Sequence, residues 1–261
     1  MELNIYQIDA FSSAVLKGNP AAVILLDKWL PDDVLQAIAN ENNLSETVYV
    51  VKNEDRFNIR WFTPLSEVEL CGHATLAVAF VLFHELGYPH DVIYFDSLSG
   101  ELKVEKLGDW LELDFPVQAP VECESPLNLL KAFAEKPKVC LKAKDYIVVF
   151  ESERQIIQAK PNYSLLTDLG LRGVAITAQS QSCDFITRFF APKYGINEDP
   201  VTGSAFTQLA PYWASVMKKQ QFSAKQVSSR GGEVKCRLQG DRVKIAGQAV
   251  KYMQGKIYLE T

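Results

Sequence analysis

"NIRWFTP" (residues 58–64) and "ITRFFAP" (residues 186–192) are two segments of one 261-residue chain that share an arginine, a phenylalanine and a proline in register. The shared residues lie 128 positions apart. Two further pairs follow in the same order: "GHATLAVA" (72–79) with "GSAFTQLA" (203–210), and "GELKVEKLGDWLEL" (100–113) with "GEVKCRLQGDRVKI" (232–245). Because the offset drifts by only four residues across the three pairs, we interpret the chain as an internal duplication.

The duplication predicts two half-domains of like fold. Each half contains alternating strands, an Arg–aromatic–Phe strand, a Gly-led turn, a helix and a hairpin. The helices expected at residues 74–87 and 204–219 are apolar on nearly all sides, which predicts that they are buried. We therefore expect an α+β fold in which each half is a mixed, barrel-like sheet around a central helix. The proline-containing stretch 114–125 marks the boundary, which gives halves of residues 1–118 and 119–261.

The composition is that of a soluble globular protein, with 48% hydrophobic and 23% charged residues. A net charge of -5 and the lack of a dense Lys/Arg cluster argue against a nucleic-acid partner. No apolar run approaches the roughly 20 residues of a membrane helix, and the first residues lack the pattern of a secretion signal. We expect no membrane partner and a cytoplasmic location.

The cysteines and histidines do not form a recognisable metal or disulfide pattern. The five cysteines are widely spaced, without any CxxC pair: Cys71, Cys123, Cys140, Cys183 and Cys236. Such spacing fits neither a disulfide framework nor a zinc site. With only three histidines in the chain, we predict reduced thiols and no metal ion.

A Gly-led turn opens the apolar helix in each half, at "LCGHAT" (70–75) and "PVTGSA" (200–205). Backbone N–H groups at a helix start have no intrahelical partner and carry partial positive charge, so such turns can bind anions. The alternative is ordinary capping, in which Thr75, Thr202 or Ser204 accepts those N–H bonds. Because both turns occupy equivalent positions of the duplication, we favour a site for a small carboxylate-bearing molecule.

Three titratable residues accompany these turns. Glu46 begins a strand, and Asp199 precedes the second turn, where Pro200 restrains the backbone. His73 lies in the first turn, where the helix dipole is expected to lower its pKa and favour a neutral imidazole. Each has an ordinary alternative role, as a strand residue, a helix cap or a surface group. Together, around paired anion-binding turns, they suggest proton transfer without a cofactor.

Cys71 requires separate consideration because it precedes a helix start. That position can lower the pKa of a thiol and make it the base of a cofactor-independent racemase. A racemase of this kind needs a second base from the other half, and the repeat places Thr202 there, which cannot act as a base at neutral pH. We favour a buried, unreactive Cys71, and a Cys71-dependent amino-acid epimerase is the alternative.

Six motifs occur in an order that resembles the phenazine-biosynthesis isomerase (PhzF-like) family over nearly the whole chain. They are "GNPAAV" (18–23), "NLSETVYV" (43–50), "RWFTPLSEVELCGHATLA" (60–77), "RFFAP" (188–192), "EDPVTGSA" (198–205) and "SSRGGEV" (228–234). The cysteine in the first turn is similar to the branch called phenazine biosynthesis-like domain proteins. The resemblance implies a diaminopimelate-epimerase-like fold with its site in the cleft between the halves. It also implies a homodimer that isomerises a small acid, as the phenazine enzyme does with a dihydro-hydroxyanthranilate, without a cofactor.

The resemblance also implies roles for individual residues. Glu46 matches the glutamate that shuttles the proton. The expected substrate contacts are Gly72 and His73 in the first turn, Asp199, Gly203 and Ser204 at the second, and Asn19 and Pro20 near the cleft. One departure is Phe206, where family members commonly carry histidine, which predicts a more apolar pocket. Because fold does not guarantee activity, a catalytically silent binding module with the same fold is a further alternative.

Overall fold

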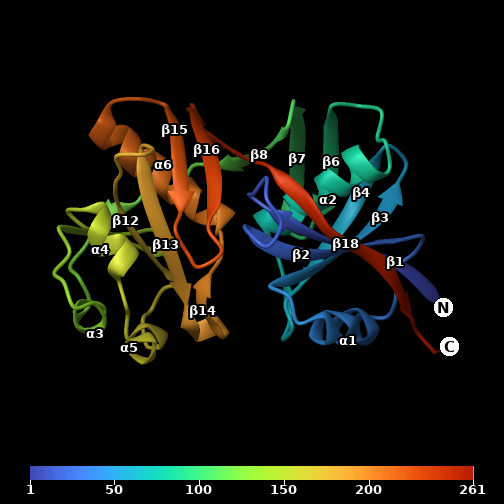
Figure 1. The fold of residues 1–261 in the computed structure, drawn as a ribbon, viewed down its shortest axis with the longest axis horizontal. Coiled ribbons are helices and arrows are strands. Elements are labelled where there is room, and N and C mark those ends of the chain that lie inside the picture. The colour runs from blue at the N-terminus through green and yellow to red at the C-terminus, as the bar shows by residue number, and fades with distance from the viewer. Residues whose placement is uncertain (261) are drawn as a thin grey trace. The chain divides into compact units, whose positions relative to one another are not determined.

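The chain forms two compact units in a computed structural model that describes residues 1–260. Unit 1 contains Met1–Asp114 and the C-terminal segment from Ala246 onward, and unit 2 is Phe115–Ile245. The division in the N-terminal part lies close to the predicted boundary at residue 118. The C-terminal segment differs from the prediction, because strand β18 (Ala249–Tyr258) pairs with β1 (Glu2–Ala10) and so belongs to unit 1 (Figure 1).

Unit 1 is a mixed sheet in the order β18–β1–β2–β3–β4–β6–β7–β8, with the short β5 also paired to β4. The β2–β3 and β4–β6 pairings are parallel and the others antiparallel. The remaining strands of this unit are β2 (Asn19–Leu26), β3 (Glu46–Asn53), β4 (Arg56–Phe62), β5 (Glu67–Val68), β6 (Val92–Ser97), β7 (Gly100–Leu107) and β8 (Trp110–Pro116).

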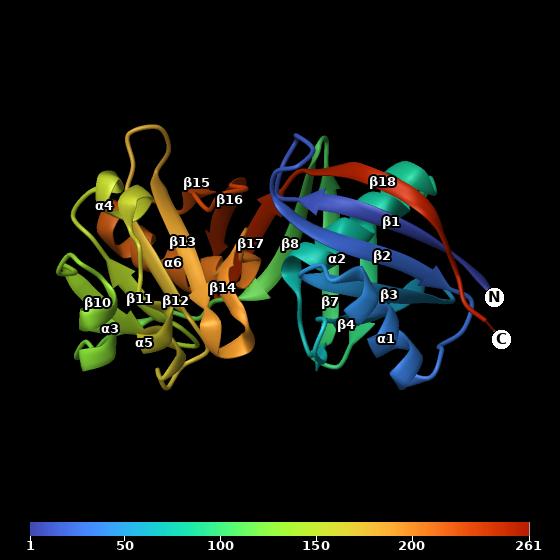
Figure 2. The same ribbon diagram turned by 60° about the horizontal axis from the view of Figure 1, so that its bottom comes forward.

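Helix α2 (Gly72–Phe80) is the buried helix of unit 1. It contacts β1, β2, β3 and β18, and one π-helical turn (Val81–Glu85) continues it (Figure 2). All its residues except Phe80 are buried, as the apolar pattern predicts. The peripheral helix α1 (Asp32–Asn42) begins after Pro31 with two acidic residues in its first turn and ends at Asn43 in the left-handed conformation. These are common start and stop signals.

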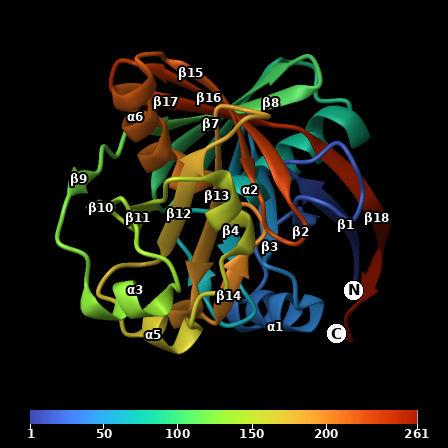
Figure 3. The same ribbon diagram turned by 60° about the vertical axis from the view of Figure 1, so that its left-hand side comes forward.

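Unit 2 contains a second mixed sheet in the order β9–β10–β11–β12–β13–β15–β16, with β14 also paired to β13 (Figure 3). Its strands are β9 (Val121–Glu122), β10 (Val139–Lys142), β11 (Tyr146–Val149), β12 (Val174–Gln179), β13 (Phe185–Ala191), β14 (Ile196–Asp199), β15 (Gln221–Gln226) and β16 (Gly232–Gln239), and β17 (Arg242–Gly247) begins in unit 2 and ends in unit 1. Its helices are α3 (Leu127–Ala132), α4 (Glu153–Gln158), α5 (Tyr163–Thr167) and α6 (Phe206–Met217), with 3₁₀ turns at Pro192–Tyr194 and Gly203–Ala205. Every helix within residues 1–260 is too short or too polar to cross a lipid bilayer.

Helix α6 tolerates a proline in its interior. Pro211 cannot donate to the carbonyl of Thr207, four residues before it. The backbone N–H of Gln118 donates to that carbonyl instead, over 3.0 Å. The acceptor left by the proline is therefore satisfied, and the helix continues to Met217.

The two units share one topology, which confirms the duplication and the α+β class. The pairings β2–β3, β3–β4, β4–β6 and β6–β7 alternate parallel and antiparallel in the same way as β11–β12, β12–β13, β13–β15 and β15–β16. The Arg–aromatic–Phe strand is β4 in unit 1 and β13 in unit 2. Barrel-like closure of each sheet stays a prediction.

The repeated arginine makes the same two contacts in both units, with a glutamate and with an aromatic ring. Arg60 Nε donates to Glu67 Oε1 over 2.7 Å, and its guanidinium lies 5.1 Å from the ring centre of Phe62. Arg188 Nε donates to Glu198 Oε1 over 2.7 Å, and its guanidinium lies 5.2 Å from the ring centre of Phe190. The repeated motif is thus an ion pair stacked on an aromatic ring, which ties each central strand to the segment that follows it.

Candidate active site

The predicted site residues of unit 1 gather at the start of α2. His73 is the second residue of the helix and Glu46 the first residue of β3, which packs against it. His73 Nε2 lies 2.9 Å from Glu46 Oε2, and the two side chains are 7% and 12% exposed. Gly72 opens the helix next to them. Glu46 and His73 are far apart in the sequence, and the packing of α2 against β3 brings their side chains into contact.

Two more groups contact the other nitrogen of the His73 ring. Nδ1 lies 3.2 Å from Asn19 Nδ2 and 3.4 Å from Cys71 Sγ. Asn19 is the first residue of β2, followed by Pro20, and β2 is the parallel neighbour of β3. The result is a buried cluster of one carboxyl group, one imidazole, one thiol and one amide.

Burial decides the state of the Cys71 thiol. Desolvation, and then the charge of Glu46, raise the pKa of Cys71 above its ordinary value. These effects outweigh the stabilisation of a thiolate expected at a helix start. The thiol therefore remains protonated at neutral pH, as expected for a buried, unreactive cysteine.

The expectation of a lowered pKa for His73 is wrong. Burial by itself lowers the pKa of the imidazole, but the adjacent Cys71 and Glu46 raise it well above its usual value. Because the Cys71 thiol stays protonated, we attribute the increase to the Glu46 carboxylate at 2.9 Å. The contact with an ionised carboxylate is stronger than the effect of the helix dipole, which is worth about 0.3–1 kcal/mol at most surface sites.

The two ring nitrogens of His73 have different partners. When both nitrogens are protonated, Nδ1–H can donate to Cys71 Sγ, and the Glu46 carboxylate, with Oε2 2.9 Å from Nε2, is the charge partner on the other side. When Nδ1 is deprotonated, it accepts from the amide of Asn19. The cluster therefore contains a partner for each protonation state of the ring.

Neither turn uses the predicted capping residues to cap its helix. The Thr75 hydroxyl donates to the Cys71 carbonyl over 2.6 Å and does not accept an N–H at the start of α2. At the second turn, Ser204 Oγ accepts from Arg172 over 3.1 Å, and the Thr202 hydroxyl donates to the Asp199 carboxylate. These side chains therefore do not act as helix caps.

A hydrogen-bonded frame fixes the second turn of unit 2. Asp199 ends β14, and the buried Gln226 donates to its carbonyl over 2.7 Å. Gln226 also accepts from the Thr202 N–H over 2.9 Å, and Ser228 donates to the Pro200 carbonyl over 2.8 Å. The frame sets the direction of the backbone that leads into Gly203 and Ser204.

A buried ion pair beside Ser204 was not predicted from the sequence. Arg172 binds both oxygens of Asp145, over 2.8 and 2.6 Å, and Asp145 has no exposed surface. Gln208 donates to the same carboxylate over 2.6 Å and accepts the Asp145 N–H over 2.9 Å. The available signal in the sequence was Gln208, a long polar side chain in a helix whose pattern predicts burial. The network places a guanidinium directly next to the second turn.

The prediction for Phe206 is not supported, because its side chain is part of the core. Phe206 has no exposed surface, and its ring centre lies 6.1 Å from that of Phe185. Phe185 in turn stacks on Trp213, with ring centres 5.5 Å apart. Phe206 therefore contributes to the packing of α6 on the sheet and not to the apolar lining of a pocket.

The cluster at the start of α2 could also hold a metal ion. Glu46, Cys71 and His73 each offer one ligand atom, and these atoms lie within 4.8 Å of one another. Carboxylate, thiolate and imidazole are ligands of Zn²⁺. The sequence-based expectation of no metal therefore stays a prediction.

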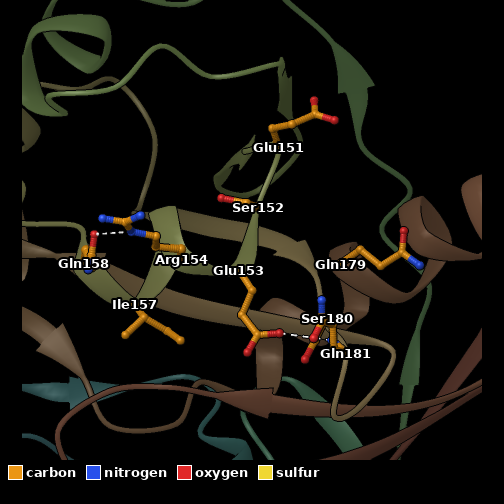
Figure 4. A pocket seen from close by; sticks show the side chains of 9 residues that line it. All are labelled: Glu151, Ser152, Glu153, Arg154, Ile157, Gln158, Gln179, Ser180 and Gln181. Carbon is orange, nitrogen blue, oxygen red and sulfur yellow. Dashed lines mark hydrogen bonds between the residues drawn. The ribbon is translucent and has the colours of Figure 1, made fainter.

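A surface hollow of about 680 Å³ in unit 2 contains no predicted site residue (Figure 4). It is lined by Glu151, Ser152, Glu153, Arg154, Ile157, Gln158, Gln179, Ser180 and Gln181. Its polar groups bind each other: Glu153 accepts from the Gln181 N–H over 3.1 Å, and Arg154 donates to Gln158 over 3.1 Å. With these groups satisfied and with no convergent set of titratable side chains, the hollow does not suggest chemistry.

Comparison with known proteins identifies the family. A family model described as phenazine biosynthesis-like protein matches residues 8–255. An uncharacterized isomerase of Pseudomonas aeruginosa is 50% identical over 99% of this chain and 100% of its own length. Phenazine biosynthesis-like domain-containing protein 1 of mouse is 38% identical over 98% of this chain and 99% of its own.

The same relationship holds for solved structures. A crystal structure of a PhzF-family phenazine biosynthesis protein from Enterococcus faecalis superimposes with a TM-score of 0.97 at 43% identity, covering 99% of this chain and all of that one. The resemblance inferred from the motifs is confirmed, and the relatives support an isomerase-type activity. From its sequence, its topology and its relatives, the chain belongs to the phenazine biosynthesis-like (PhzF) protein family.

Proposed function

We propose that the chain is a cofactor-independent isomerase that moves a proton on a small carboxylic acid, with Glu46 as the general acid/base. The observation that carries this proposal is the buried contact between Glu46 and His73 at the start of α2. A carboxyl group that transfers protons must be held in one position and shielded from bulk water. Glu46 meets both conditions, because it begins a strand and its side chain is 12% exposed.

In the proposed reaction, the Glu46 carboxylate removes a proton from one carbon of a conjugated acid and returns it to another. His73 acts as the electrostatic partner of Glu46 and as a contact for the substrate's polar groups. In its protonated form it stabilises the carboxylate before the transfer. Asn19 and Cys71 orient its ring through Nδ1. One proton leaves the substrate for Glu46 and one proton returns from Glu46 after exchange with solvent, so the reaction is redox-neutral and no oxidant or cofactor takes part in this mechanism.

For unit 2 we propose that Gly203 and Ser204 bind the substrate carboxylate and that Asp199 contacts another polar group. The rigid frame of Gln226 and the guanidinium of Arg172 beside Ser204 support this role. Pre-organised donors of this kind lose little entropy on binding an anion. Homodimer formation, a cytoplasmic location and a contribution of Pro20 to substrate binding stay predictions.

The thiol of Cys71 is the less favoured base. It is 6% exposed and its pKa is raised, so little thiolate is available to remove a proton from carbon. The equivalent residue of unit 2 is Thr202, whose hydroxyl donates to Asp199. A two-base epimerase mechanism therefore lacks its second base.

The test is turnover on a panel of small unsaturated carboxylic acids, including a dihydro-hydroxyanthranilate, by Glu46→Gln and Cys71→Ala variants. We expect Glu46→Gln to lose about 10²- to 10⁴-fold in rate, the usual contribution of a general acid/base. Glu41→Gln, which removes an exposed carboxylate from α1, is the matched control and should retain the wild-type rate. Loss of activity in Cys71→Ala alone would favour the epimerase, and binding without turnover by the wild type would favour a binding module.

A further inference from the structure

Two cysteines of unit 2 lie next to each other on paired strands, and the proposed reaction uses neither of them. Cys123 follows β9 and Cys140 lies in β10. Glu122 pairs with Leu141, so Cys123 is directly opposite Cys140, and the Cys123 N–H donates to the Cys140 carbonyl over 3.0 Å. The two Sγ atoms are 3.7 Å apart. The chain therefore presents a vicinal pair of thiols formed by residues 17 positions apart.

We infer that Cys123 and Cys140 form an oxidisable dithiol that a peroxide converts into an intramolecular disulfide. The sulfur atoms need to approach by about 1.7 Å to reach the bond length of about 2.05 Å. Directly opposed residues of antiparallel strands have Cα atoms about 4.5–5.5 Å apart, within the range of disulfides. Rotation about the side-chain bonds can supply the movement without separating the strands.

The two thiols differ in access, which sets the order of the steps. Cys123 is half-buried, whereas Cys140 is 5% exposed and burial raises its pKa to about 11. The Cys123 sulfur attacks the peroxide, forms a sulfenic acid and releases water or an alcohol. The Cys140 sulfur then attacks that sulfenic sulfur, the S–S bond forms and water leaves. In total two thiols are oxidised by two electrons and one peroxide is reduced.

The surroundings favour a small neutral oxidant. Glu122 and Glu124 flank Cys123 and are both exposed. Their charges repel anionic reagents such as glutathione disulfide, but they do not repel hydrogen peroxide. Around this pair lies a core that includes Leu129, Ala132 and Tyr146. A disulfide would therefore fasten the segment that carries α3 to the edge of the sheet.

The experiment treats the reduced, full-length protein with hydrogen peroxide, alkylates the remaining thiols with iodoacetamide and maps the peptides by mass spectrometry. We expect a Cys123–Cys140 cross-linked peptide, a loss of two hydrogen atoms from the intact mass and full reversal by dithiothreitol. Oxidation should raise the melting temperature of the wild type by several degrees, because the closed loop restricts the unfolded chain. Cys183, a half-buried thiol that donates to the Phe185 carbonyl, is the internal control and should form no disulfide.

Two serine variants test the assigned order. Cys140→Ser should stop at a sulfenic acid on Cys123 that dimedone traps, and Cys123→Ser should leave Cys140 reduced. The proposal is overturned if no Cys123–Cys140 peptide forms, or if Cys123 reacts no faster than Cys183. It is equally overturned if glutathione disulfide yields a stable mixed disulfide at Cys123 that Cys140 fails to displace.

Discussion

The two units share a duplicated fold but differ in chemistry, and the first residue of β3 and its counterpart in unit 2 show this difference. Thr47 pairs with Phe62, and Val174 pairs with Phe190 at the equivalent place, so Glu46 corresponds to Gly173. A Cβ atom at Gly173 would lie 2.6 Å from the Phe189 ring and 2.8 Å from the Phe190 carbonyl. Unit 2 therefore has no space for any side chain where unit 1 carries its proposed acid/base.

The two Gly-led turns also carry different side chains in the two units. Cys71 and His73 of unit 1 correspond to Thr202 and Ser204 of unit 2. A carboxyl group, an imidazole and a thiol surround the first turn, whereas hydroxyl groups and the Arg172 guanidinium surround the second. This difference supports the proposal that unit 1 supplies the group that moves the proton and unit 2 the groups that bind the substrate carboxylate.

The largest effect on stability is expected from the ion pair that distinguishes unit 2. Arg172→Met leaves the fully buried Asp145 without its cation and should reduce the free energy of unfolding by about 3–5 kcal/mol. Urea denaturation measures the change. Arg154→Met, which removes an arginine that donates to Gln158, is the control. A loss as small as that of the control would show that this network does not hold unit 2 together.

The repeated arginine should contribute more to the free energy of unfolding in unit 2 than in unit 1. Arg188 also donates to the carbonyls of Ile156 and Ala159 and is 12% exposed, whereas Arg60 is 21% exposed and its additional partner Asp32 is 78% exposed. Arg188→Met should therefore reduce the free energy of unfolding by about 2–3 kcal/mol and Arg60→Met by about 1 kcal/mol. Equal losses of unfolding free energy in urea denaturation would contradict the expectation that the additional partners of Arg188 make it the more stabilising arginine.

The lack of space at Gly173 can be tested with one methyl group. Gly173→Ala should reduce the free energy of unfolding by about 1–2 kcal/mol, because its Cβ meets a backbone carbonyl and a buried ring. Gly170→Ala is the matched control, since its Cβ would have no neighbour within 4 Å. If the two variants have the same melting temperature, position 173 can accept a side chain and the comparison with Glu46 loses its basis.

The smallest expected effect is a change in how stability depends on pH. The pKa of folded His73 is raised above its unfolded value of about 6.5, so its stabilising contribution is complete below that value and disappears as pH rises through the folded pKa. The groups that face its ring are Glu46, Cys71 and Asn19. The stability difference between the wild type and His73→Gln should therefore shrink with rising pH, whereas Ser204→Ala should show no such trend. A difference that grows with pH would mean that the sign of the shift is wrong.

The sequence was sufficient for the duplication, the two buried helices and the hairpins, because each depends on local pattern or on similarity within the chain. It did not predict that β18 returns to unit 1, since strand pairing between the chain ends has no local signal. The ion pair of Arg172 and Asp145 was not predicted, because it depends on the fold and not on a local sequence pattern. The pKa of His73 was predicted with the wrong sign because the dipole could be read from the sequence and the contact with Glu46 could not.

The most direct test of the central claim, that Glu46 carries the proton, is the incorporation of solvent deuterium into an acid that the wild-type protein accepts. In deuterated buffer, followed by NMR, Glu46→Gln should incorporate deuterium at least about 10²-fold more slowly than the wild type. Cys71→Ala and Glu41→Gln should incorporate it at the wild-type rate. Incorporation by Glu46→Gln at the wild-type rate would contradict the account.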